Sequence, residues 1–192
     1  MIQLYSQIWQ VINFNILFAA ILLFLIGYGL APTAHFKNIK WLTAYPFFIM
    51  GLMDKYFKYN WPAVKIFFII FILNSCSLFI NLLSAWGIIT PFLFIIYLGI
   101  NMGVIIYHSF NGQFYFSSLF NPVAIFELPA AWISITMAIQ FSLKKFFHAG
   151  FLSEISFLQY IQYFVLSVLP LLFIAGIIEA ALIVWARRKD EE

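Results

Sequence analysis

Two acidic residues, Glu127 and Glu179, lie inside long apolar stretches of the sequence. Glu127 is the only Asp, Glu, Lys or Arg between Lys65 and Lys144. Glu179 precedes Arg187 by two helical turns, which places it about 12 Å inside the end of a helix. Since an ionisable group at such a depth is costly in hydrocarbon, we expect both carboxyl groups to face protein or trapped water. These acids are therefore the first candidates for a functional site.

Amide side chains in two other apolar stretches are candidate partners for the acids. Asn74 and Asn81 fall on one face of a predicted helix, together with Ser77 and Ser84. Asn101 lies in the next apolar stretch. In a bilayer such polar faces point inward, toward other helices. We therefore predict an intramembrane polar network made of Glu127, Glu179, Asn74, Asn81 and Asn101.

This network admits two interpretations. In the first, the polar groups bond across helices and fix their register, at roughly 0.6 to 2 kcal/mol each, in a structural or adaptor subunit of a membrane complex. In the second, the same groups line a route for protons, ions or small polar solutes, and the protein is a small channel or transporter subunit. Rows of small residues favour assembly, whereas intramembrane carboxylates favour passage.

The sequence contains no motif of an enzyme class that we can recognise. It has no His-Glu-x-x-His, no pair of cysteines, no glycine-rich phosphate loop and no Gly-x-Ser-x-Gly. His35, His108 and His148 fall near the ends of apolar stretches, which favours a place at the membrane interface over metal ligation. We predict a protein that is not an enzyme, with no catalytic residue, no metal and no cofactor.

The composition is that of an integral membrane protein. The chain is 65% hydrophobic and 9% charged, with a mean hydropathy of +0.99, whereas soluble domains are about a quarter charged. A membrane span needs roughly 20 apolar residues. We predict one all-α domain over residues 1–192, a polytopic bundle of about five spans in contact with membrane lipids. The spans are expected at 11–31, 66–84, 92–107, 122–143 and 159–186. The chain has no basic stripe for nucleic acid.

The stretch 35–65 differs from the rest because it mixes Lys, Tyr and Trp with a short apolar piece at 46–53. That piece is too short to span a bilayer, so we predict an interfacial amphipathic helix. Asp54 and Lys58 are one turn apart, a spacing at which the two side chains can pair. With five spans, this stretch and the C-terminus share one side, which then holds eight of the ten Lys and Arg. We therefore expect that side to be cytoplasmic and the N-terminus to be outside.

Small residues recur at helical spacing in two spans. Gly99 and Gly103 form one small-xxx-small pair, and Ala130, Ser134, Ala138 and Ser142 follow one another every four residues. Such rows let a second backbone approach closely. The longer row suits either another helix of the chain or a second copy, so we expect a homodimer or another homo-oligomer.

Four prolines are expected to shape the spans. Pro32 is expected to end the first span, and Pro170 to bend the last one. Pro122 and Pro129 flank Glu127 and permit a broken helix, either kinked or re-entrant.

The order of these features resembles the stage II sporulation protein M family of integral membrane proteins. The resemblance covers residues 66–184, and its most telling pieces are Phe126-Glu127-Leu128-Pro129-Ala130 and the Ala-Gly-Ile-Ile-Glu at 175–179. Family members commonly have His-Gly where this chain has Val123-Ala124. The resemblance implies a multi-pass helical protein. Sporulation members work with a peptidoglycan-degrading complex, which implies a membrane-complex partner, while many other members come from organisms that do not sporulate.

Overall fold

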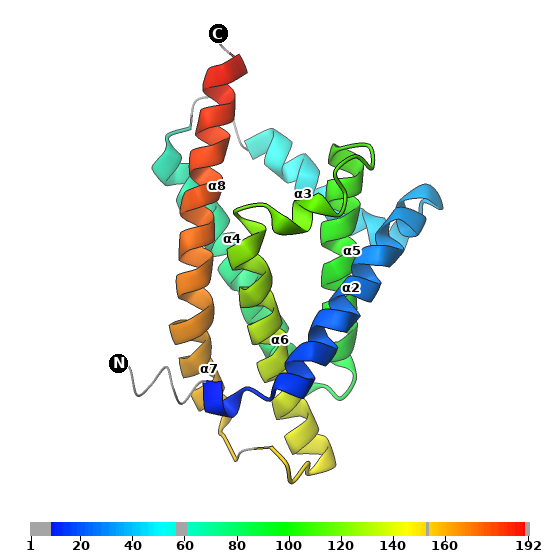
Figure 1. The fold of residues 1–192 in the computed structure, drawn as a ribbon, viewed down its shortest axis with the longest axis vertical. Helices are drawn as coiled ribbons and strands as arrows, with labels where there is room; N and C mark the ends of the chain where they lie inside the picture. The colour runs from blue at the N-terminus through cyan, green and yellow to red at the C-terminus, as the bar shows by residue number, and fades with distance from the viewer. Residues whose placement is uncertain (1–8, 57–60, 153, 191–192) are drawn as a thin grey trace.

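The computed structural model describes residues 9–56, 61–152 and 154–190 (Figure 1). This part of the chain is helical and contains no strand. Five of its helical segments are long and apolar enough to cross a membrane, which confirms the predicted fold class. Four of them are α2 (Phe14–Phe36), α4 (Ala63–Leu83), α5 (Thr90–Ser109) and α6 (Ala124–Phe147). The fifth joins α7 (Phe157–Tyr163), the π-helical turn η3 (Phe164–Val168) and α8 (Leu169–Asp190).

Helix α6 lies at the centre of the bundle. Two thirds of its membrane segment is buried (67%), against 28–39% for the other four spans. Helices α2 and α5 form a close pair on one side of α6, and α4 and α8 lie on the other side (Figure 1). The core is therefore built around α6, where small side chains admit neighbours from both sides.

The row of small residues on α6 packs against other segments of the same chain. Ala130, Ser134, Ala138 and Ser142 are fully buried. The hydroxyl of Ser134 donates to the carbonyl of Leu78 on α4 at 2.7 Å, and that of Ser142 donates to the carbonyl of Gly87 at 2.9 Å. This row cannot serve a second copy while the bundle is intact. A homo-oligomer remains a prediction, and it must use another face.

Glycines on α2 and α5 allow these two helices to touch through their backbones. A Cβ added at Gly99 would lie 2.2 Å from the carbonyl oxygen of Phe24, and one at Gly103 would lie 2.5 Å from the Cβ of Ala31. On the opposite helix, a Cβ at Gly27 would lie 2.1 Å from the carbonyl oxygen of Ile96. The pair Gly99 and Gly103 thus packs against α2, and Gly27 on α2 is a third glycine of the same contact, which was not predicted.

The expectation that Pro32 ends the first span is wrong, because α2 continues to Phe36. Proline has no N–H, so the carbonyl of Tyr28, one turn earlier, loses its helical partner. The hydroxyl of Tyr115 donates to that carbonyl instead. The helix therefore continues past the proline, since a side chain from the loop after α5 satisfies the free backbone group.

The other prolines act differently. Pro129 lies within an uninterrupted α6, so the broken helix that Pro122 and Pro129 permit is not observed. Pro170 follows the π-helical turn η3, the type of irregularity that is expected where proline disturbs a helix.

The stretch predicted as interfacial contains a shorter helix, α3 (Lys40–Tyr56). Leu42 of α3 packs with Ala31 and Ala34 of α2 and with Val104 of α5. Residues 35 and 36 belong to α2, and α4 already begins at Ala63, so both ends of the predicted segment belong to spans. The Asp54–Lys58 pair lies outside the described side chains.

A buried glutamine ties the start of the chain to α6. Gln140 is 1% exposed, its Nε2 donates to the carbonyl of Val11 at 2.9 Å, and its Oε1 accepts from the amide of Asn13 at 3.2 Å. We expect Gln140→Leu to cost about 1 to 3 kcal/mol, because two backbone groups lose their partner. Thermal unfolding in detergent measures this loss, with the exposed Gln113→Leu as the control. Equal midpoints for the two variants would contradict this role of Gln140.

Candidate functional site

The candidate site lies where α4, α6 and α8 meet. The Nδ2 of Asn74 on α4 donates to the Oε1 of Glu127 on α6 at 2.5 Å. Both side chains are half-buried. The bond between Ser134 and Leu78 fixes the register of these two helices, which run in the same direction (Figure 1). Glu127 precedes Ser134 and Asn74 precedes Leu78 on these helices, so both side chains of the site lie on the N-terminal side of that bond.

Helix α8 brings the second acid to the same site. Ala180 packs with Ile66 and Ile70 of α4. The small residue Gly176 leaves room for the ring of Phe67, since a Cβ there would lie 3.3 Å from it. This close approach places Glu179 near enough to Glu127 for their charges to interact. Glu179 is also half-buried, and it accepts no hydrogen bond from the described residues.

The two remaining amides of the predicted network do not reach the acids. Asn81 lies two turns further along α4 than Asn74, about 10 Å away, and its Nδ2 is buried without a described partner. Asn101 is on α5, which pairs mainly with α2, and its Oδ1 likewise has no described partner. The structure thus joins Asn74 with Glu127, places Glu179 beside them, and leaves Asn81 and Asn101 apart.

Helix α6 starts deep in the bundle. Its first turn lies well below the upper ends of α4, α5 and α8, and the chain after α5 descends to reach it (Figure 1). Asn121 caps this start: its Oδ1 accepts from the amides of Val123 and Ala124, both at 2.9 Å. Glu127 is in the first turn of α6, where the helix dipole favours a negative charge. The dipole therefore offsets part of the cost of burying this acid inside the span.

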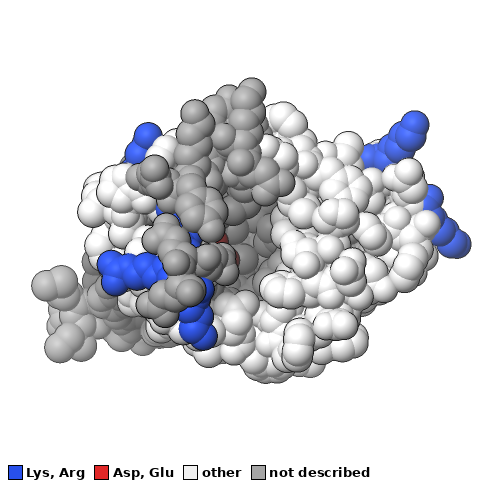
Figure 2. All heavy atoms as spheres, turned by 90° about the horizontal axis from the view of Figure 1, so that it is seen from above, with Lys and Arg blue, Asp and Glu red and all other residues white. Residues whose placement is uncertain are grey.

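The site is approached from one end of the molecule. Figure 2, the view from the end that carries the C-terminus, shows acidic atoms deep between the helices, with Lys and Arg beside them and at the outline of the molecule. Below this level the packed cluster of Leu78, Ala130 and Leu172 fills the space between the helices. This cluster closes the space between the described parts of α4, α6 and α8 below the acids.

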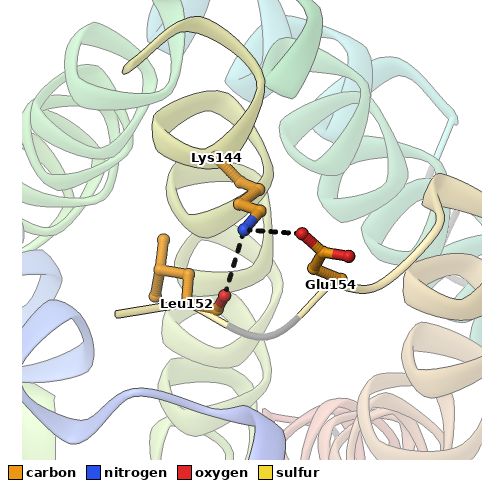
Figure 3. Close-up of polar contacts among 3 residues, drawn as sticks. All are labelled: Lys144, Leu152 and Glu154. Atoms are coloured by element: carbon orange, nitrogen blue, oxygen red, sulfur yellow. Dashed lines mark hydrogen bonds and ion pairs between the residues drawn. The ribbon is translucent and has the colours of Figure 1, made fainter. Parts of the chain in front are cut away.

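The opposite end of the bundle carries a separate ion pair. The Nζ of Lys144, at the end of α6, lies 3.4 Å from the Oε1 of Glu154 and donates to the carbonyl of Leu152 at 3.5 Å (Figure 3). The carboxylate of Glu154 is highly exposed. An exposed pair of this kind contributes at most about 1 kcal/mol.

The described residues contain no group of three or more His, Cys, Asp and Glu side chains that could hold a metal ion. His35 and His108 lie at the ends of α2 and α5, where their rings pack 5.4 Å apart among aromatic side chains. His148 adopts a left-handed conformation just after α6. The site made by Asn74, Glu127 and Glu179 can accept hydrogen bonds, exchange protons and attract cations.

The sequence matches the family described as stage II sporulation protein M over residues 14–182. The match includes both intramembrane acids and extends the resemblance back to the first span. No match was found among curated proteins or among solved structures. Because the match covers nearly the whole chain, including at least part of each of the five spans, the protein belongs to the stage II sporulation protein M family.

Proposed function

We propose that this protein is a non-enzymatic multi-pass membrane protein that acts as a structural or adaptor subunit of a membrane complex. The observation that carries the proposal is the hydrogen bond between Asn74 and Glu127, which joins two helices inside the span. An intramembrane acid whose partner is supplied by the same chain stabilises one helix arrangement. The tight internal packing of α6 agrees with a rigid subunit.

We further propose that the C-terminus is cytoplasmic and the N-terminus outside. Six described basic residues support this, because they lie at the end of the bundle that carries the C-terminus. They are Lys37, Lys40, Lys65, Arg187, Arg188 and Lys189. The other end has Lys144 and Lys145, and Lys144 is paired with Glu154. The asymmetry follows the bias of cytoplasmic loops toward Lys and Arg.

A second candidate function is the passage of protons, ions or small polar solutes. The acidic atoms in Figure 2 favour it, since they lie deep between the helices and are visible from one end of the molecule. Glu179, which has no hydrogen-bonding partner among the described residues, is the group that a cation would meet. In this alternative the packed cluster below Glu127 must open for transport to occur.

A flux measurement separates the two functions. Purified protein in liposomes should conduct no protons, monovalent ions or small solutes above the level of empty liposomes if it is a subunit of a complex. Glu127→Gln and Glu179→Gln should then leave the flux unchanged but weaken site-specific cross-links to the partner in native membranes. Glu154→Gln is the control, because this exposed acid lies at the other end of the bundle. A flux that Glu127→Gln abolishes and Glu154→Gln preserves would establish transport instead.

A further inference from the structure

A groove of about 540 Å³ lies on the outer surface of the bundle, where the ends of α2 and α5 meet the loop that follows α5. Gly29 and Pro32 of α2 form its floor, and the aromatic side chains of Tyr107, Phe114 and Phe116 form its walls. Gly29 is exposed, and a Cβ added to it would meet no atom within 4 Å. The groove is therefore apolar, open to the outside and independent of the site around Glu127.

The loop after α5, which lines one side of the groove, is held against α2 by two reciprocal hydrogen bonds. The hydroxyl of Tyr28 donates to the carbonyl of Tyr115 at 2.5 Å, and the hydroxyl of Tyr115 donates to the carbonyl of Tyr28. The two rings stack 4.4 Å apart. Burial, helped by the nearby Tyr28 and Tyr107, raises the pKa of Tyr115, so its hydroxyl keeps its proton. The groove is thus preformed, which lowers the entropic cost of filling it.

The position of the groove along α2 corresponds to the outer part of the hydrocarbon layer. Gly29 and Pro32 lie eight and five residues before Lys37, which is about 12 and 8 Å along the helix. Phe36 lies on the same helix face as Gly29, and its ring contacts Tyr107 at 5.3 Å between centroids. An apolar chain in the groove would therefore run past Phe36 toward the level of Lys37.

The charges at this corner of the molecule are basic. Lys37 directly follows α2 and Lys40 begins α3, while the described residues of α2, of α5 and of the loop after α5 carry no acidic side chain. A cation about 8 Å further along the helix than Pro32 of an apolar groove complements a molecule with an anionic head and an apolar tail. Basic residues at the membrane surface attract anionic lipids by about 1 kcal/mol each.

We propose that this groove binds one anionic phospholipid, with an acyl chain between Gly29 and the aromatic walls and the phosphate near Lys37 and Lys40. A lipid is the natural occupant because α2 is a membrane span and Gly29 is on its outer face. It does not depend on the function proposed above.

The test compares two ways of removing the lipid. Gly29→Leu fills the groove without disturbing the fold, since the added side chain enters open space; Gly51→Leu, on α3, also enters open space and is the matched control. The double variant Lys37→Gln, Lys40→Gln removes only the charges. The unfolding midpoint of each protein is measured in detergent with added phosphatidylglycerol or phosphatidylcholine, and the lipids retained after purification are counted by native mass spectrometry.

We expect phosphatidylglycerol to raise the midpoint of the wild type and of Gly51→Leu more than phosphatidylcholine does. Gly29→Leu should lose at least half of this shift and the retained lipid, and the lysine variant should respond equally to both lipids. An unchanged response of Gly29→Leu would overturn the groove as the site. If the two lipids shift the unfolding midpoint of the wild type equally, the groove does not select an anionic headgroup. The same conclusion follows if the lysine variant still responds more to phosphatidylglycerol than to phosphatidylcholine.

Discussion

Replacing Gly27 or Gly99 by alanine should force α2 and α5 apart and cost about 1 to 3 kcal/mol or more. The added Cβ would lie 2.1 Å from the carbonyl oxygen of Ile96 in the first variant and 2.2 Å from that of Phe24 in the second. Both obstacles are backbone atoms of a neighbouring helix, so no side chain can rotate away. In lipid, helices are held together mainly by close packing, and separation of the two backbones removes that contact over the whole crossing.

Gly29→Ala is the matched control for this prediction. It lies two residues from Gly27 on the same helix, but its Cβ would point into open space. Alanine there should be neutral or stabilising by about 0.5 to 1 kcal/mol, because it favours the helical backbone. The three variants are compared by thermal unfolding in the same detergent. Similar midpoints for Gly27→Ala and Gly29→Ala would show that α2 and α5 do not pack through their backbones.

The number and order of the spans could be predicted from the sequence, because a membrane requires long apolar helices whatever their neighbours are. The helix ends were less predictable. Pro32 has the sequence signature of a stop, yet α2 passes through it because Tyr115, more than eighty residues later, satisfies the carbonyl of Tyr28. A local rule fails here since a distant part of the chain supplies the missing hydrogen bond.

The sequence was sufficient to select the two acids and Asn74 as residues of the candidate site. It was not sufficient to exclude Asn81 and Asn101. The depth of a residue in the membrane and the helix face on which it lies follow from its position in the sequence. Which other helix packs against that face depends on how the helices are arranged in the bundle. Asn81 shares a face with Asn74 but is too far along α4, and Asn101 belongs to the α2 side of the bundle. Gln140 carried no pattern at all, because its partners are backbone groups near the start of the chain.

The small-residue row of α6 illustrates the same limit. Its spacing predicts a close helix contact, and the structure provides that contact through α4 and the turn at Gly87. The spacing does not tell whether the neighbouring helix belongs to the same chain or to a second copy, because either helix can pack against the same small residues.

Asn74→Leu and Glu127→Leu should each destabilise the bundle by about 1 to 3 kcal/mol, and the double variant should lose less than the sum of the two. Each single change leaves the other polar group without its partner inside the span. The double change leaves two apolar side chains, which suit a helix contact in lipid. The coupling energy expected for one intramembrane hydrogen bond is about 1 to 2 kcal/mol.

Unfolding of the four proteins by denaturing detergent measures this coupling. Asn101→Leu combined with Glu127→Leu is the matched control, because the same kind of amide is removed from a helix that makes no described bond to the acid. That control pair should be additive. If the Asn74 and Glu127 losses also add, the bond does not hold α4 to α6, and the proposed structural role of the site fails, since a carboxyl group that holds no neighbouring helix serves a ligand or a proton instead.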